Sequence, residues 1–220
     1  MPKNNAEKIL KILKNNFSLP KWVSTERNPF QTLVVTIISQ NTAGKNTIRA
    51  FEALSNRLPI TPEALAKADL KEIEASLHVA GLFRNKARVI KKVSQIIIER
   101  FHGSLDWIYS MPFEKTRETL LSLPGVGPKT ADVVLLFSAK RPTIPVDTHV
   151  ERVSKRLGLV PEKANYEDIR TALQTLYLPD DYLDVHLLFI SLGRSYCKAL
   201  KPLCKQCPVS GLCPSKRIED

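Results

Sequence analysis

Four cysteines with metal-ligand chemistry stand near the end of the chain in the spacing C-x6-C-x2-C-x5-C: Cys197, Cys204, Cys207 and Cys213. Thiolates bind zinc and iron–sulfur clusters. A redox dithiol would use only the central pair and leave the outer two cysteines idle. A structural zinc usually takes two short pairs, and only one C-x2-C pair is present here. The spacing alone therefore leaves a zinc site and a [4Fe–4S] cluster open as alternatives.

The stretch LPGVGPKTAD at residues 123–132 is a second candidate for chemistry, because two glycines precede a lysine at the start of an apolar run. A nucleotide phosphate loop needs glycine directly before the Lys-Thr pair, and Pro128 occupies that position. A plain turn between helices would explain the glycines but not the lysine and exposed amides that follow them. Glycines let a backbone approach a phosphate closely, and amides at a helix N-terminus favour an anion. The stretch therefore favours a hairpin that holds the phosphates of a polymer.

The net charge points to the same kind of partner. The chain has 220 residues, with 33 Lys and Arg against 22 Asp and Glu, which gives a formal charge of +11. This excess favours a polyanion, most simply nucleic acid. No apolar run approaches the roughly 18–20 residues of a membrane helix, and the lysine-rich start has helical periodicity instead of a signal-peptide block. We therefore expect a cytoplasmic, nucleoid-associated protein with no membrane partner and no disulfides.

The hydrophobic pattern predicts an all-α protein that would position these groups. Thr61-Pro62 marks a helix start, and Thr148-x-x-Glu151 has the pattern of a capping box. Apolar residues recur at spacings of three and four, and no strand alternation or repeat competes with them. The predicted helices cover residues 9–17, 29–39, 62–70, 87–103, 113–122, 129–139, 148–157, 166–177 and 182–192.

Three features of the sequence resemble one family, in order along the chain. The cysteine tail looks like the C-terminal cluster loop of the endonuclease III family of DNA glycosylases, in which this spacing carries a [4Fe–4S] cluster. The stretch LPGVG resembles the hairpin of that family's helix–hairpin–helix. The segment IPVDTHVERV at residues 144–153 resembles the segment with the family's aspartate, and Asp147 follows Lys129 by 18 residues, as in the family. Fainter similarity reaches back to FQTLVVTIISQNT.

The resemblance implies an all-α, two-lobed helix–hairpin–helix DNA glycosylase fold with a C-terminal iron–sulfur cluster loop. One lobe would be a helical barrel over residues 24–141 that ends in the hairpin, and the other would combine residues 1–23 and 142–220 around the cluster. The implied activity is that of a bifunctional DNA glycosylase/AP lyase of base excision repair. Its partner would be double-stranded DNA with damaged bases, notably oxidised pyrimidines, or abasic sites, bound by a monomer.

The resemblance also implies roles for individual residues. Lys129 would be the nucleophile that attacks C1′ of the sugar, and Asp147 the carboxylate that stabilises the oxocarbenium-like sugar. The four cysteines would be the cluster ligands. Lys129 could instead be a surface phosphate contact, and Asp147 a helix N-cap. The Thr148-x-x-Glu151 pattern offers another cap, which would leave Asp147 free for chemistry.

The DNA contacts implied by the family fall in the hairpin, in two loops and in the cluster loop. The loop at residues 40–42 and the loop at residues 81–83, which we call the wedge loops, would enter the gap left by the flipped base. Asn41 stands where the enzymes of pyrimidine lesions carry glutamine. The basic run from Arg84 to Lys92 would lie along phosphates. The predicted DNA-binding residues are Gln40, Asn41, Leu82, Phe83, Gly125, Val126, Gly127, Thr130, Lys201 and Lys205.

Other functions stay open at this point. A mismatch-specific thymine or uracil DNA glycosylase is one alternative, although related ones replace the lysine. An enzyme that removes adenine opposite oxidised guanine would carry glutamate where this chain has Thr36 and would lack the lysine. A non-catalytic DNA-binding iron–sulfur protein is a third. Covalent trapping with borohydride separates this last class from a lyase, because only a Schiff-base enzyme becomes attached to DNA.

Overall fold

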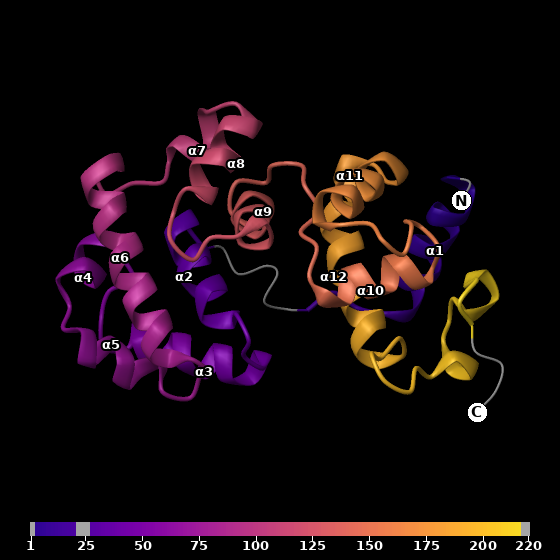
Figure 1. Cartoon of the computed structure of the whole chain (residues 1–220), viewed down its shortest axis with the longest axis horizontal. Helices are drawn as coiled ribbons and strands as arrows, with labels where there is room; N and C mark the ends of the chain where they lie inside the picture. Colours follow the sequence, from indigo (N-terminus) through magenta and orange to yellow (C-terminus); the bar gives the residue numbers. More distant parts are fainter. Residues whose placement is uncertain (1–2, 21–26, 217–220) are drawn as a thin grey trace. The chain divides into compact units, whose positions relative to one another are not determined.

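The computed structural model describes residues 3–20 and 27–216, and every regular element within them is helical (Figure 1). The predicted all-α class is therefore confirmed. The chain divides into two compact units, one formed by Met1–Thr25 with Pro142–Asp220 and the other by Glu26–Arg141. None of the described helices is long and apolar enough to cross a membrane.

The unit Glu26–Arg141 is built around α2, whose sequence is apolar nearly all round. Its buried side chains belong to a core shared with the helices on each side, and α2 packs against α3, α6 and α9. Asn28 caps α2 by accepting a hydrogen bond from the amide of Gln31. The helices of this unit are α2 (Pro29–Ser39), α3 (Gly44–Ser55), α4 (Pro62–Lys67), α5 (Leu70–Leu77), α6 (Phe83–Phe101), α7 (Trp107–Ser110), α8 (Phe113–Leu121) and α9 (Pro128–Phe137).

The second unit is assembled from both ends of the described chain. The buried helix α12 packs against α10 and also against α1, and Lys14 of α1 pairs with Asp181 at 2.7 Å and with Asp184 at 2.8 Å. Hydrogen bonds to these two carboxylates raise the pKa of Lys14. The elements of this unit are α1 (Lys3–Asn16), α10 (Thr148–Arg156), α11 (Tyr166–Leu176), α12 (Tyr182–Ser195) and the short 3-10 turns η2 (Pro179–Asp181), η3 (Cys204–Gln206) and η4 (Ser210–Leu212).

The predicted helix over residues 62–70 is too long. Helix α4 ends at Lys67, because Ala68 turns to an extended backbone with ψ of 148°. Asp69 then caps a separate helix, α5, by accepting from the amide of Lys71 at 2.9 Å. The sequence pattern passed over this second cap and also over α3.

Candidate active site and DNA-binding surface

The hairpin between α8 and α9 uses its two glycines for different reasons. Gly125 has φ of +74°, and a Cβ there would lie 2.5 Å from Cγ1 of Val89 on α6. Gly127 has an ordinary φ of −91°, and a Cβ there would meet nothing within 4 Å. Gly125 is therefore needed for the fold of the hairpin, whereas the absence of a side chain at Gly127 keeps the surface in front of α9 open.

Two sets of polar contacts fix the hairpin within its unit. Nε2 of Gln40 donates to the carbonyl of Gly125 at 3.0 Å and to Oγ1 of Thr130 at 3.3 Å. Below the turn, the buried Arg117 of α8 binds both carboxylate oxygens of Asp132 of α9, at 2.9 and 3.2 Å. Removal of one member of such a buried pair typically costs about 3–5 kcal/mol of stability. The hairpin is thus a rigid feature.

Lys129 is the second residue of α9 and lies half-buried directly behind this open surface. No side chain caps the helix at Gly127, so the amides of the first turn are available to an anion. Val126 and Thr130 are buried. The amide of Val126 already donates to the carbonyl of Leu123 at 3.2 Å, so of these two residues only Thr130 could offer a backbone amide to DNA. The arrangement can hold a phosphate next to a lysine amine.

The two glycines give a matched pair of variants. We expect Gly127→Ala to fold like the wild type but to bind DNA about ten-fold more weakly, because a methyl group keeps the phosphate from charged hydrogen bonds worth about 1.5–3 kcal/mol each. Gly125→Ala should instead lose about 1–3 kcal/mol of stability through the clash with Val89. Thermal unfolding and DNA titration of both variants check this. Wild-type affinity in Gly127→Ala would show that no phosphate approaches that face.

Asp147 is the N-cap of α10. Its Oδ1 accepts from the amide of His149 at 2.9 Å and from the amide of Val150 at 2.8 Å. The expectation that Thr148 and Glu151 form the cap is wrong: Thr148 is already the first residue of the helix, and Glu151 pairs with Lys155 at 2.7 Å. Both capping bonds use Oδ1, and within residues 3–20 and 27–216 Oδ2 accepts none. The cap therefore orients the carboxylate and leaves one oxygen for chemistry.

The two wedge loops touch each other. A Cβ at Gly81 would lie 3.0 Å from the carbonyl oxygen of Asn41, a tight contact, so glycine favours this close approach of the two loops. Asn41 and Leu82 both adopt the left-handed backbone, with φ of 50° and 57°. Leu82 is 64% exposed and Phe83 half-buried. The structure therefore presents an exposed leucine at the junction of two loops, as expected of a residue that enters a gap in DNA.

Two of the basic residues predicted to lie along phosphates point elsewhere. The ammonium group of Lys86 is buried and donates to the carbonyl of Ile38, and Lys91 donates to the carbonyl of Ala68. Both carbonyls lie at helix C-termini, where a cation is favoured. Burial lowers the pKa of Lys86. The prediction was wrong for these two lysines, and the exposed residues of the run are Arg84, Arg88 and Lys92.

One signal in the sequence could have identified the burial of Lys86. With Ile90, Val93 and Ile97 it falls at helical spacing on a single face of α6, and that face is buried. A lysine within an apolar stripe faces the core.

The four cysteines line one cavity of the second unit, together with Arg156, Leu192 and Val209. Burial raises the pKa of the Cys207 and Cys213 thiols, and the neighbouring cysteines add to the rise. In the described part of the chain, no three His, Cys, Asp or Glu converge as ligands of a single metal ion. Four cysteines around one cavity offer the thiolate ligands that a zinc ion or an iron–sulfur cluster takes.

Two arginines of α10 fasten the cysteine loop. Nε of Arg152 donates to the carbonyl of Cys197 at 2.9 Å, and Arg156 donates to the carbonyls of Lys198 and Ala199. Beyond them, Lys201 and Lys205 are exposed. The loop therefore presents its basic residues to solvent from a fixed base, as a phosphate contact requires. Sequence reasoning missed the two arginines.

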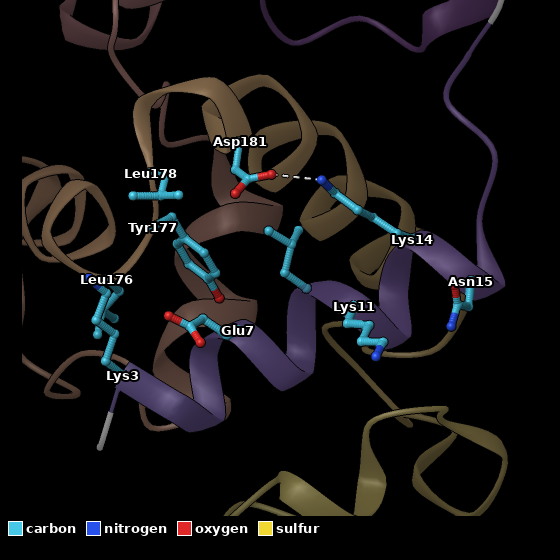
Figure 2. A pocket seen from close by; sticks show the side chains of 10 residues that line it. Lys3, Glu7, Lys11, Lys14, Asn15, Leu176, Tyr177, Leu178 and Asp181 are labelled. Carbon is cyan, nitrogen blue, oxygen red and sulfur yellow. Dashed lines mark hydrogen bonds and ion pairs between the residues drawn. The ribbon is translucent and has the colours of Figure 1, made fainter.

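One cavity, of about 310 Å³, lies elsewhere (Figure 2). It is bounded by α1 and the segment after α11, with Lys3, Glu7, Leu10, Tyr177 and Asp181 in its wall. None of the site residues predicted from the sequence lines it. This cavity is therefore separate from the residues expected to do chemistry.

Solved structures place this fold among the DNA glycosylases. The structure of a trapped endonuclease III–DNA covalent intermediate matches with a TM-score of 0.85 and 31% identity, over 98% of this chain and 97% of the other. A thermostable thymine-DNA glycosylase matches with a TM-score of 0.78 at 22% identity, over 96% of this chain and 94% of the other. The second likeness shows the fold alone.

Sequence comparison defines the family. The family model described as "HhH-GPD superfamily base excision DNA repair protein" matches residues 34–179. Endonuclease III of Sulfolobus acidocaldarius is 38% identical over 188 residues, which cover 85% of this chain and 82% of that protein. The chain belongs to the HhH-GPD superfamily of base excision DNA repair proteins. It is a DNA glycosylase/lyase of base excision repair, which confirms the family, the fold and the enzyme class predicted from the sequence.

Proposed function

We propose that this chain excises oxidised pyrimidine bases from double-stranded DNA as a monomer, and cleaves the strand 3′ to the resulting abasic site by β-elimination. One observation carries the proposal: Lys129 lies in the first turn of α9, directly behind a hairpin whose Gly127 leaves the approach open. The formal charge of +11 suits action on chromosomal DNA in the cytoplasm, in association with the nucleoid.

The proposed reaction begins with extrusion of the damaged base from the stack, which costs a few kcal/mol. Nζ of Lys129, as the free amine, attacks C1′ while the glycosidic bond breaks and the base leaves with the bonding electrons and a proton. The sugar ring then opens to a Schiff base between Nζ and C1′. Loss of a proton from C2′ expels the 3′ phosphate. A lysine attacks only when deprotonated, so the site must favour the neutral amine.

Asp147 would stabilise the positive charge that develops on the sugar as the base departs. Its support is the cap geometry, because two amides hold Oδ1 and leave Oδ2 without a bond from any residue of the described part. In this proposal the unit Glu26–Arg141 is the barrel lobe and carries the hairpin and Lys129, while Asp147 and the cysteines belong to the other unit.

The hairpin, wedge loops and cluster loop would share the binding of DNA. The amides of Gly125, Gly127 and Thr130 and the exposed Lys201 and Lys205 would hold phosphates, which fixes register without reading sequence. Gln40, Asn41, Leu82 and Phe83 would fill the gap left by the extruded base.

The cofactor would be a [4Fe–4S] cluster held by the four cysteines, which line one cavity as that group needs. It would supply a structural centre for the loop and no redox chemistry on the base. Purified protein should be brown, with iron and acid-labile sulfide in equal amounts, and Cys207→Ser should lose both. A colourless, fully active protein with one zinc per chain would contradict the cluster.

A panel of duplexes with single lesions, each assayed with and without borohydride, tests the proposed activity. We expect excision of oxidised pyrimidines, strand cleavage, and a covalent complex with DNA after reduction. Excision of mismatched thymine or uracil without a covalent complex would favour the alternative of a mismatch-specific glycosylase. That alternative is kept because Asn41 departs from the pyrimidine-lesion enzymes and the thymine-DNA glycosylase shares the fold.

A further inference from the structure

Lys86 is a buried cation with a specific set of partners. It is 3% exposed, and its Nζ donates to the carbonyl of Ile38 at 2.8 Å and to Oγ1 of Thr42 at 2.5 Å. Within residues 3–20 and 27–216 it has no carboxylate partner. We propose that Lys86 is a positioning residue for base extrusion: it holds the two wedge loops together without touching DNA. This inference rests on the proposed function.

A lysine is a costly choice for this position. An ammonium group loses its hydration on burial, and a methionine of similar length would fill the same space without that cost. What the methionine lacks is the ability to donate to two acceptors at once. The two acceptors bracket the first wedge loop, since Ile38 lies in the last turn of α2 just before it and Thr42 is its last residue.

Lys86 itself follows the second wedge loop by one turn of α6. Its amide donates to the carbonyl of Leu82 at 3.1 Å, so its backbone is fixed to one loop while its side chain is fixed to the other. Asn41 and Leu82 are both held at positive φ, a backbone state that persists only where the surroundings impose it. The two hydrogen bonds of the Lys86 ammonium group, together with its backbone bond to Leu82, supply that constraint.

The same junction reaches the hairpin. Gln40, at the C-terminus of α2, donates to the carbonyl of Gly125, and Val89 of α6 abuts Gly125. Val89 and Lys86 lie three residues apart on α6 and therefore on neighbouring parts of one face. A change at Lys86 would alter how the exposed Leu82 is placed relative to the hairpin that holds the strand.

The test compares Lys86→Met with Lys71→Met, in which an exposed lysine on α5 of the same unit is changed. We expect Lys86→Met to slow single-turnover excision of a damaged base by about 100-fold, the size of effect seen when remote changes displace a site by an ångström. Cleavage of a preformed abasic site, which has no base to extrude, should change less than about three-fold, and the salt dependence of binding should be unchanged. Lys71→Met should excise and bind DNA like the wild type, because its exposed side chain lies outside the residues proposed to contact DNA.

Three further readouts keep the inference falsifiable. Fluorescence of 2-aminopurine beside the lesion should report slower extrusion in Lys86→Met, and amide hydrogen exchange in residues 40–43 and 81–84 should speed up. Thr42→Val, which removes one of the two hydrogen bonds, should show the same effects to a smaller degree, and it tests the inference if Lys86→Met fails to fold.

Excision by Lys86→Met at the wild-type rate, or an equal loss of excision and abasic-site cleavage, would overturn the positioning role of Lys86. A wild type without excision would overturn the proposed function instead, while the hydrogen-exchange result would still support or contradict Lys86 as the tie between the loops.

Discussion

Replacing Lys129 by alanine is expected to abolish strand cleavage and borohydride trapping while DNA affinity stays within about three-fold of the wild type, because one phosphate contact among many contributes modestly. The reason is chemical: without an amine at C1′ no Schiff base forms, and β-elimination loses its electron sink. The measurement is covalent trapping and gel-resolved cleavage on a duplex with one abasic site.

Lys115→Ala is the matched control, since Lys115 is exposed on α8 of the same unit and pairs with Glu118 in a surface ion pair. It should trap like the wild type. Lys129→Gln should fail as Lys129→Ala does, although it retains a polar side chain. Undiminished trapping in Lys129→Ala would remove this lysine from the mechanism and return it to the role of a phosphate contact.

Asp147→Asn is expected to fold normally and to lose excision by about 100-fold or more, the scale of a lost acid–base or electrostatic group. Asparagine is as good an N-cap as aspartate, so the bonds to the amides of His149 and Val150 can persist while the charge is removed. Asp147→Ala should lose about 1 kcal/mol of stability as well, because the cap disappears. Single-turnover excision and thermal unfolding of both variants separate the two roles.

A different result for these two variants would assign Asp147 a purely structural role. If Asp147→Asn excised bases at the wild-type rate and only Asp147→Ala were impaired, Asp147 would be a cap and nothing more. The structure makes this comparison meaningful, because both capping bonds fall on Oδ1 and the second oxygen takes part in none within the described residues.

The parts of the fold that the sequence predicts well are those set by local chemistry. Helix α2 is apolar on nearly every face and is central, as its composition requires. The hairpin follows from glycines and a proline at fixed positions. The four cysteines that the spacing singles out all line one cavity. In each case neighbours in the sequence decide the outcome, so no knowledge of distant contacts is needed.

The errors arise where two local signals compete or where a distant partner decides. Asp147 and Thr148 are both good caps, and the backbone of Asp147, extended at ψ of 179°, selects the first. The spacing of Lys86 indicates that it faces the core, but its acceptors, Ile38 and Thr42, lie 48 and 44 residues away in the sequence. The roles of Arg152 and Arg156 depend likewise on a loop more than 40 residues further along the chain. No pattern in a single sequence reports such pairs.

The discontinuous unit has a consequence for how the chain is made. Helix α1 leaves the ribosome well before the helix that it packs against, α12, has been synthesised. Until then the apolar side chains of Ile9, Leu10 and Leu13 lack their partners, whereas Glu26–Arg141 can already close its own core during translation. Truncation of the message before α12 would therefore yield a chain in which the unit Glu26–Arg141 is folded but the apolar side chains of α1 stay exposed. Quality-control proteases would recognise that product through the exposed apolar side chains of α1, although the missing segment is α12.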